Sequence, residues 1–225
     1  MKRAWRASSR WWNSVFAIVT LATASGAASA ADLVGDAVAR YSVVESYTVT
    51  LRSYTEPGGP FREIIRYSYS KPGWVRMDFL RPHAGMVLIY DPERKAVRLW
   101  PFGPHGPGLS LDPGSWLLAS AGGHRADRSD IAALLAQVAA LRERGRAENL
   151  GEEALSGRRA VHLRITGLGE AEVEGVHRFD LWLDAISLMP LKVEAYGRSD
   201  VPVDFVLMDD LELNVALPRR LFEKP

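Results

Sequence analysis

The sequence contains no cysteine in its 225 residues. Disulfide bonds are therefore excluded, and so is a thiol nucleophile, because both need a cysteine sulfur. The same absence rules out anchoring through a lipid-modified N-terminal cysteine, so we do not expect this chain to be a lipoprotein itself. The fold must be stabilised by packing and hydrogen bonding alone.

The chain also lacks an excess of basic charge. It has 28 Lys and Arg residues against 27 Asp and Glu. Four of the basic residues and none of the acidic ones lie in residues 1–30, so residues 31–225 carry 24 basic and 27 acidic side chains, a formal net charge of −3. Nucleic-acid binding needs a basic surface, and anionic lipid headgroups attract polybasic segments. We therefore expect no nucleic-acid partner.

No apolar run is long enough for a comfortable membrane span of about 20 residues. The apolar segment Ser14–Ala24 follows a basic N-terminus and precedes Ala28-Ser29-Ala30, which has the small-x-small form of a cleavage site. This order is typical of a secretory signal peptide, the alternative being an uncleaved anchor. We expect removal of residues 1–30 and a single, soluble, monomeric domain over residues 31–225 in the periplasm.

The sequence also lacks a recognisable set of catalytic or metal-binding residues. Ser115 follows a glycine, but Pro-Gly-Ser-Trp-Leu lacks the second glycine of a nucleophile elbow. A hydrolase is kept as an alternative that would need Ser115 or His124 for activity. The histidines show none of the HxH, HExxH or HxxxH spacings of metal sites. They are His83, His105, His124, His162 and His177. We therefore predict no metal, no cofactor and no enzymatic activity.

What the sequence does have is alternation of apolar and polar residues, which predicts β-strands. The clearest block is Ser70–Phe102, which reads as three antiparallel strands ending at turns rich in Pro and Gly. Further strands are expected over Tyr47–Tyr54, Phe61–Ser70, Ala160–Thr166, His177–Asp184, Met189–Tyr196 and Val203–Leu213. Residues 101–114 are expected to be a loop.

Two helices complete the pattern. A short one is expected over Asp32–Tyr41, and a longer one runs from an N-cap at Ser129 to a C-terminal cap at Gly145. Short connections imply antiparallel neighbours. The predicted fold class is α+β, with a single large curved antiparallel sheet, an unclosed β-barrel, and helices covering its concave face.

Large, soft apolar side chains recur on the expected strands. An ordinary core explains any single one, whereas the whole set indicates a core left incompletely filled, with a ligand cavity between sheet and helices. An acyl chain gains about 0.8 kcal/mol per buried methylene, so sixteen carbons gain roughly 12 kcal/mol before ordering costs. The set comprises Trp74, Met77, Phe79, Met86, Trp100, Trp116, Trp182 and Met189.

The order of short motifs in this chain resembles the LolA-type periplasmic carriers of outer-membrane lipoproteins and their superfamily, which includes LolB and RseB. The motifs are Lys71-Pro72, Trp74–Phe79, Arg81-Pro82, Met86–Tyr90, Asp91–Lys95 and Leu99-Trp100. The later segments Gly151–Thr166 and Leu181–Tyr196 resemble matching strands of lipoprotein-sorting relatives. The resemblance covers most of residues 31–225.

The resemblance implies an unclosed barrel with a helical lid, a cavity for acyl chains, no cofactor and no catalysis. It implies that Lys71 helps to hold the lid closed, although these carriers have Arg there and Lys offers a point charge instead of a planar fork. The residues expected to line the cavity are Ile65, Tyr67, Val75, Met77, Phe79, Met86, Leu88, Leu99, Trp116, Leu134, Val138, Leu163 and Leu181.

Two functions follow from the resemblance. The first is a carrier that binds lipoprotein acyl chains or another lipid and ferries it towards the outer membrane, with an inner-membrane exporter or an outer-membrane receptor as further partners. The second is a lipid or envelope-stress sensor, or an adaptor of the RseB type, that binds a membrane protein.

Overall fold

The computed structural model describes residues 29–115 and 126–224. The expected signal peptide, apart from its last two residues, lies outside these ranges, as do Trp116 and His124. The described chain contains two α-helices, α1 (Ala30–Ser42) and α3 (Ile131–Glu143), and the short 3-10 turns Ala126–Arg128, Arg198–Asp200 and Arg219–Phe222.

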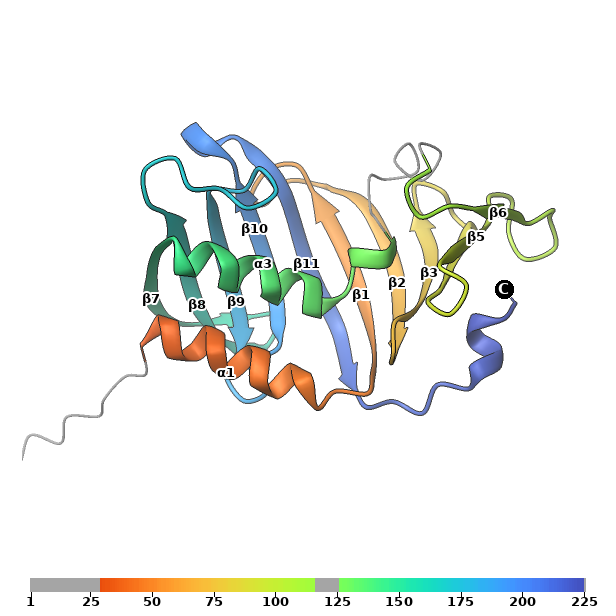
Figure 1. The fold of residues 1–225 in the computed structure, drawn as a ribbon, viewed down its shortest axis with the longest axis horizontal. Coiled ribbons are helices and arrows are strands. Elements are labelled where there is room, and N and C mark those ends of the chain that lie inside the picture. The colour runs from red at the N-terminus through yellow and green to blue at the C-terminus, as the bar shows by residue number, and fades with distance from the viewer. Residues whose placement is uncertain (1–28, 116–125, 225) are drawn as a thin grey trace, which may run out of the picture.

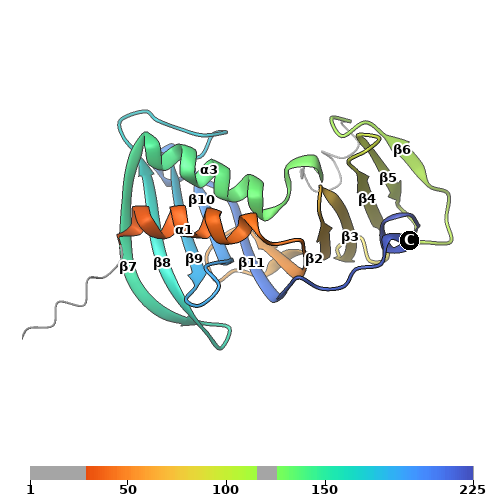
Figure 2. The ribbon, with the colours of Figure 1, turned by 60° about the horizontal axis from the view of Figure 1, so that its bottom comes forward.

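All eleven described strands join one antiparallel sheet, in the order β6-β5-β4-β3-β2-β1-β11-β10-β9-β8-β7. The strands are β1 (Ser46–Tyr54), β2 (Phe61–Ser70), β3 (Trp74–Arg81), β4 (Val87–Asp91), β5 (Ala96–Trp100), β6 (Leu109–Leu111), β7 (Gly145–Leu155), β8 (Arg158–Gly167), β9 (Arg178–Asp184), β10 (Pro190–Tyr196) and β11 (Pro202–Leu213). The sheet curves around α1 and α3 and does not close, because β6 and β7 remain edge strands (Figures 1 and 2). The predicted fold class is confirmed.

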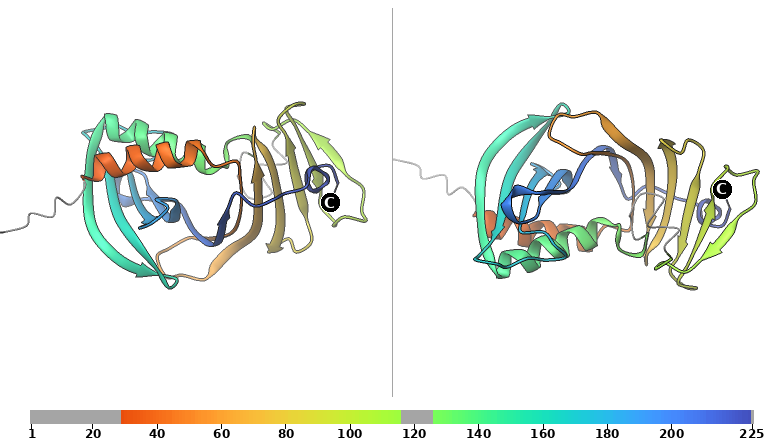
Figure 3. Two further views of the ribbon diagram at one scale, coloured as in Figure 1. Left: turned by 90° about the horizontal axis from the view of Figure 1, so that it is seen from below. Right: turned by 90° about the horizontal axis from the view of Figure 1, so that it is seen from above.

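Both helices lie side by side on the concave face, across β7–β11 and β1 (Figure 3). Their apolar sides and the inward rows of the strands form the main core, in which Val34, Ala37, Val138 and Leu141 have no exposed surface. The strands β3–β5 extend the sheet beyond the helices. The convex face of these strands is covered by residues 217–222, whose Phe222 packs against Trp74.

Two details of α3 differ from the prediction. Asp130, not Ser129, is the N-cap, because its side chain accepts a hydrogen bond from the backbone N–H of Ala133. Arg144 is the C-cap, and Gly145 already begins β7. A Cβ on residue 145 would lie 2.4 Å from the carbonyl oxygen of Thr166, so only glycine fits where β7 leaves the helix.

Candidate functional site

A cavity of about 180 Å³ lies between the N-terminal half of α3 and the concave face of the sheet. Its walls come from β1, β2, β3, β10 and β11, which the sheet order brings together although the sequence separates them. The apolar lining consists of Tyr47, Val49, Leu51, Ile65, Tyr67, Met77, Ile131, Leu134, Val193, Val206 and Met208. A polar rim is formed by Arg128, Ser129, Asp130, Gln137 and Asp204.

Four of the residues expected to line a cavity meet at this one, namely Ile65, Tyr67, Met77 and Leu134. Three others, Val138, Leu163 and Leu181, are buried in the concave core. The remaining described ones continue the same face of the sheet over β3–β5, where they are buried outside the cavity lining; they are Val75, Phe79, Met86, Leu88 and Leu99. Trp116 lies outside the described residues.

Several lining residues were not predicted, although the sequence carried a signal for them. Tyr47, Val49 and Leu51 alternate along β1, and Val193 alternates along β10. Alternation shows that such residues share a face, but not which part of the face is left unfilled. The sequence did not indicate that the polar rim faces a cavity, because its members lie on a 3-10 turn, at the two positions before α3, in the second turn of α3 and near the start of β11.

The first turn of α3 is held by tyrosines of the sheet. The hydroxyl of Tyr47 accepts a hydrogen bond from the backbone N–H of Ile131 at 3.1 Å. The hydroxyl of Tyr67 lies 3.1 Å from that of Ser129. The rings of Tyr47 and Tyr67 are stacked, with centroids 5.8 Å apart. Burial raises the pKa of both phenols, so they are neutral hydrogen-bonding groups at physiological pH.

An ionic bridge joins two of the polar lining residues to the β8–β9 connection. Glu174, in the β8–β9 connection, accepts from Arg128 at 3.1 Å through one carboxylate oxygen and from Gln137 at 2.9 Å through the other. Figure 1 shows this connection passing beside α3. Nearby, burial raises the pKa of the N-cap carboxyl of Asp130, although the backbone N–H of Ala133 opposes the shift.

Lys71 binds the C-terminal end of α1. Its ammonium donates to the carbonyl oxygen of Ser42, the last residue of α1, at 2.8 Å and to the carboxylate of Glu45 at 2.9 Å. A cation at this position satisfies a terminal carbonyl group and complements the helix dipole. The described contacts of Lys71 are therefore with α1 and its C-terminal connection, whereas tyrosines and Glu174 hold α3.

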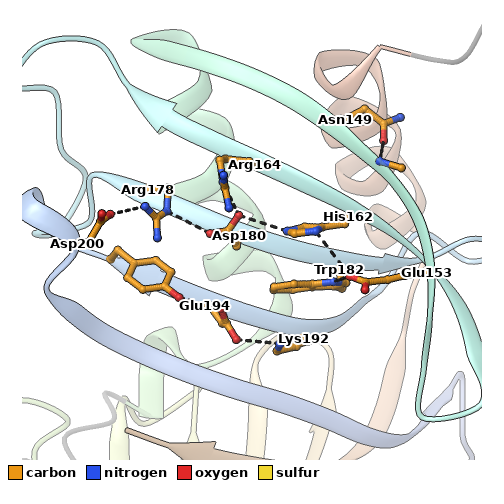
Figure 4. Close-up of polar contacts among 12 residues, drawn as sticks. Asn149, Glu153, His162, Arg164, Arg178, Asp180, Trp182, Lys192, Glu194 and Asp200 are labelled. Carbon is orange, nitrogen blue, oxygen red and sulfur yellow. Dashed lines mark hydrogen bonds and ion pairs between the residues drawn. The ribbon is translucent and has the colours of Figure 1, made fainter. Parts of the chain in front are cut away.

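The convex face is cross-linked by its own polar side chains (Figure 4). His162 stacks on Trp182 with ring centroids 4.1 Å apart, and the ammonium of Lys192 lies 4.0 Å from the centre of the same indole. The buried carboxylate of Asp180 pairs with Arg164 at 2.7 Å. The apolar cavity lies on the opposite side of the sheet, where Val193, the neighbour of Lys192 in β10, is one of its lining residues.

The described residues contain no group of three or more His, Asp or Glu side chains placed to hold a metal ion. Ser115 lies in a turn in which its N–H donates to the carbonyl oxygen of Asp112, and His124 is outside the described ranges. Within the described residues no helix is both long and apolar enough to span a membrane.

Comparison of the sequence with family models and with curated proteins found no match. Solved structures with the same fold include the following three. One is an uncharacterized conserved protein from Thermus thermophilus, with 11% identity over 87% of this chain and 93% of that chain and a TM-score of 0.52. The lipoprotein LppX of Mycobacterium tuberculosis has 9% identity over 84% and 97%, with a TM-score of 0.51. MucB has 19% identity over 89% and 64%, with a TM-score of 0.52.

At these identities the likeness is one of fold. The chain therefore shares the fold of LppX and MucB. This chain matches only 64% of the length of MucB.

Proposed function

We propose that this protein is a periplasmic carrier that binds lipoprotein acyl chains or another lipid under α3 and ferries it towards the outer membrane. The observation that supports the proposal is the cavity, because its lining combines apolar walls with a small set of polar residues. An amphiphile has the same division, with a chain to bury and a head to keep in water.

The cavity is smaller than a lipid needs. Its volume of about 180 Å³ is below the roughly 300–1,000 Å³ of small-molecule pockets. An acyl chain would therefore enter by lifting the part of α3 that covers the cavity. The gain of about 0.8 kcal/mol per buried methylene is available to offset the contacts of α3 that are lost. The closed state fills most of the space without ligand, which favours release.

The proposed carrier needs neither a cofactor nor a catalytic group, because binding and release involve no covalent change. An inner-membrane exporter or an outer-membrane receptor would be its partners. Residues 1–30 would direct the chain to the periplasm as a cleaved signal peptide.

A sensor or adaptor that binds a membrane protein is the second candidate. It is favoured by the similarity to MucB, which forms a complex with MucA. A pull-down from membranes that recovers one stable integral-membrane protein would support this candidate. Exchange of bound lipid between the purified protein and vesicles would support the carrier.

The test of lipid binding is extraction and mass spectrometry of the purified protein, followed by the shift of its melting temperature on adding palmitate. Leu134→Trp enlarges a side chain that lines the cavity, and we expect it to abolish the shift. Leu150→Trp is the matched control, because Leu150 is an exposed residue of the edge strand β7. Absence of co-purified lipid together with no shift for any amphiphile would remove the proposal.

A further inference from the structure

The bridge between Glu174 and two polar residues of the cavity lining has the chemistry of an anion-binding site. Arg128 and Gln137 donate to separate oxygens of a single carboxylate, that of Glu174. Both donors line the cavity, whereas Glu174 comes from outside it, on the β8–β9 connection. An amphiphile whose chain lies in the cavity would therefore place its head beside these two donors.

Displacing the carboxylate of Glu174 from Arg128 and Gln137 costs little stability. The side chains of Arg128 and Glu174 are 59% and 54% exposed, and ion pairs this exposed contribute little to stability. Glu174 has a φ of +50° because it lies in a tight turn that is closed by backbone hydrogen bonds between Val173 and Val176. Its carboxylate can therefore leave the two donors without any change in the backbone of the turn.

We propose that Arg128 and Gln137 form a headgroup subsite for an anionic amphiphile, and that Glu174 occupies this subsite as a substitute anion while the cavity is empty. This inference rests on the proposed function and specifies its ligand. The shared chemistry is an anion with at least two acceptor oxygens on a single acyl chain. A carboxylate and a phosphate both satisfy it.

Two carboxylates of the rim oppose this assignment and make it testable. Asp130 and Asp204 also line the cavity, and both would repel an anionic head and attract a cationic one. Asp130 faces into the helix end, where it accepts from the N–H of Ala133 and burial raises its pKa. Arg128 and Gln137 already hold a carboxylate in the presence of both acids, so the structure favours the anion.

The experiment measures the affinity of the delipidated full chain for four single-chain probes with C16 chains. They are palmitate, palmitoyl lysophosphatidic acid, monopalmitoylglycerol and hexadecylamine. We expect the two anions to bind more tightly than the neutral probe, with a preference that weakens as salt is raised. The ratio of palmitate to lysophosphatidic acid separates a carboxylate from a phosphate ligand.

Three variants complete the test. Arg128→Gln should weaken binding of the anions about tenfold and leave the neutral probe unchanged. Glu174→Gln removes the competing charge and should tighten anion binding roughly threefold. Glu172→Gln is the control, because it makes the same charge change in the same connection but pairs with Arg198.

Three other outcomes would overturn the headgroup subsite. Equal affinity for neutral and anionic probes, unaffected by Arg128→Gln, would overturn the headgroup subsite and leave lipid binding standing. Tightest binding of hexadecylamine would show that Asp130 and Asp204 govern headgroup binding, and would overturn it too. Failure of all four probes to bind would overturn the subsite, and if no lipid co-purifies with the protein either, the proposed function falls with it.

Discussion

Removing the hydroxyl of Tyr47 should loosen α3 without disturbing the sheet beneath it. In Tyr47→Phe the ring remains, so the stacking on Tyr67 and Tyr69, with centroids 5.8 and 5.0 Å away, is kept. What is lost is the acceptor for the backbone N–H of Ile131. That N–H belongs to the first turn of α3, where no carbonyl of the helix can replace the phenol.

The expected cost follows from burial. Tyr47 is 1% exposed and Ile131 3%, so water cannot easily satisfy the N–H that loses its partner. A buried donor left without an acceptor costs about 1–3 kcal/mol. For a chain of this size each kcal/mol shifts the melting temperature by about 2–4 °C. We expect a fall of about 2–12 °C, together with faster hydrogen exchange at the Ile131 amide.

Tyr41→Phe is the matched control. Tyr41 belongs to the same aromatic cluster, but within the described residues its buried hydroxyl makes no hydrogen bond. Its removal should be neutral or stabilising, because a buried polar group without a partner is unfavourable. Urea unfolding and amide exchange measure both variants. Equal stabilities for Tyr47→Phe and the parent, with unchanged protection at Ile131, would refute the role of Tyr47 in holding α3.

Three further predictions concern single contacts. Asp130→Ala removes the N-cap of α3 and should lower the free energy of unfolding by about 1 kcal/mol, measured by urea titration. Burial opposes ionisation of Asp184, but hydrogen bonds from Ser187 and the charge of Arg158 hold its pKa below the ordinary value. Its stabilisation is therefore present above about pH 4 and lost as the pH falls through the lower folded-state pKa, so Asp184→Asn should flatten the acid limb of a stability–pH curve. Lys71→Met should increase amide exchange at the C-terminal end of α1 and leave α3 unaffected.

The sheet could be predicted from the sequence where one face is buried and the other is polar. In β3 the inward Val75, Met77 and Phe79 alternate with Arg76 and Asp78, and the strand was found where expected. The same regularity predicted β2 and β9. Alternation works there because a shift by one residue would expose the apolar row.

The edge strands could not be predicted in this way. In β7 charged residues such as Arg146 and Glu148 leave no continuous apolar row, and the register shifts between Asn149 and Gly151. This strand is stabilised by its pairing with β8. The residues of β7 alone do not indicate that pairing. The strand β6 has three residues and follows a Pro/Gly-rich loop, so its pairing with β5 left no periodic signal.

The candidate site also has a part that could be predicted from the sequence and a part that could not. Its apolar wall follows from alternation, which brought Ile65, Tyr67 and Met77 into the prediction. Its ionic bridge depends on Glu174 meeting Arg128 and Gln137, which lie 46 and 37 residues away in the chain. Such contacts depend on the path of the β8–β9 connection past α3 in the folded protein. The spacing of these residues in the sequence does not predict them.

The distribution of contacts along α3 indicates how the cavity would open. The cavity lies under Ile131, Leu134 and Gln137, in the N-terminal half of the helix. Val138 and Leu141, in the C-terminal half, have no exposed surface and are fixed in the core. The N-terminal half also buries Ile131 and Leu135, but it borders the cavity, and its other contacts are a tyrosine hydrogen bond and an exposed ion pair, which contribute little.

We therefore expect α3 to hinge, with its first two turns lifting while its last turn stays packed. Hydrogen exchange with and without bound palmitate would measure this motion. Ligand should change the protection of amides in residues 131–137 and leave those in residues 139–143 unchanged. A uniform change along α3 would instead mean that the helix moves as a rigid unit, and the buried contacts of Val138 and Leu141 would then have to be broken with each ligand bound.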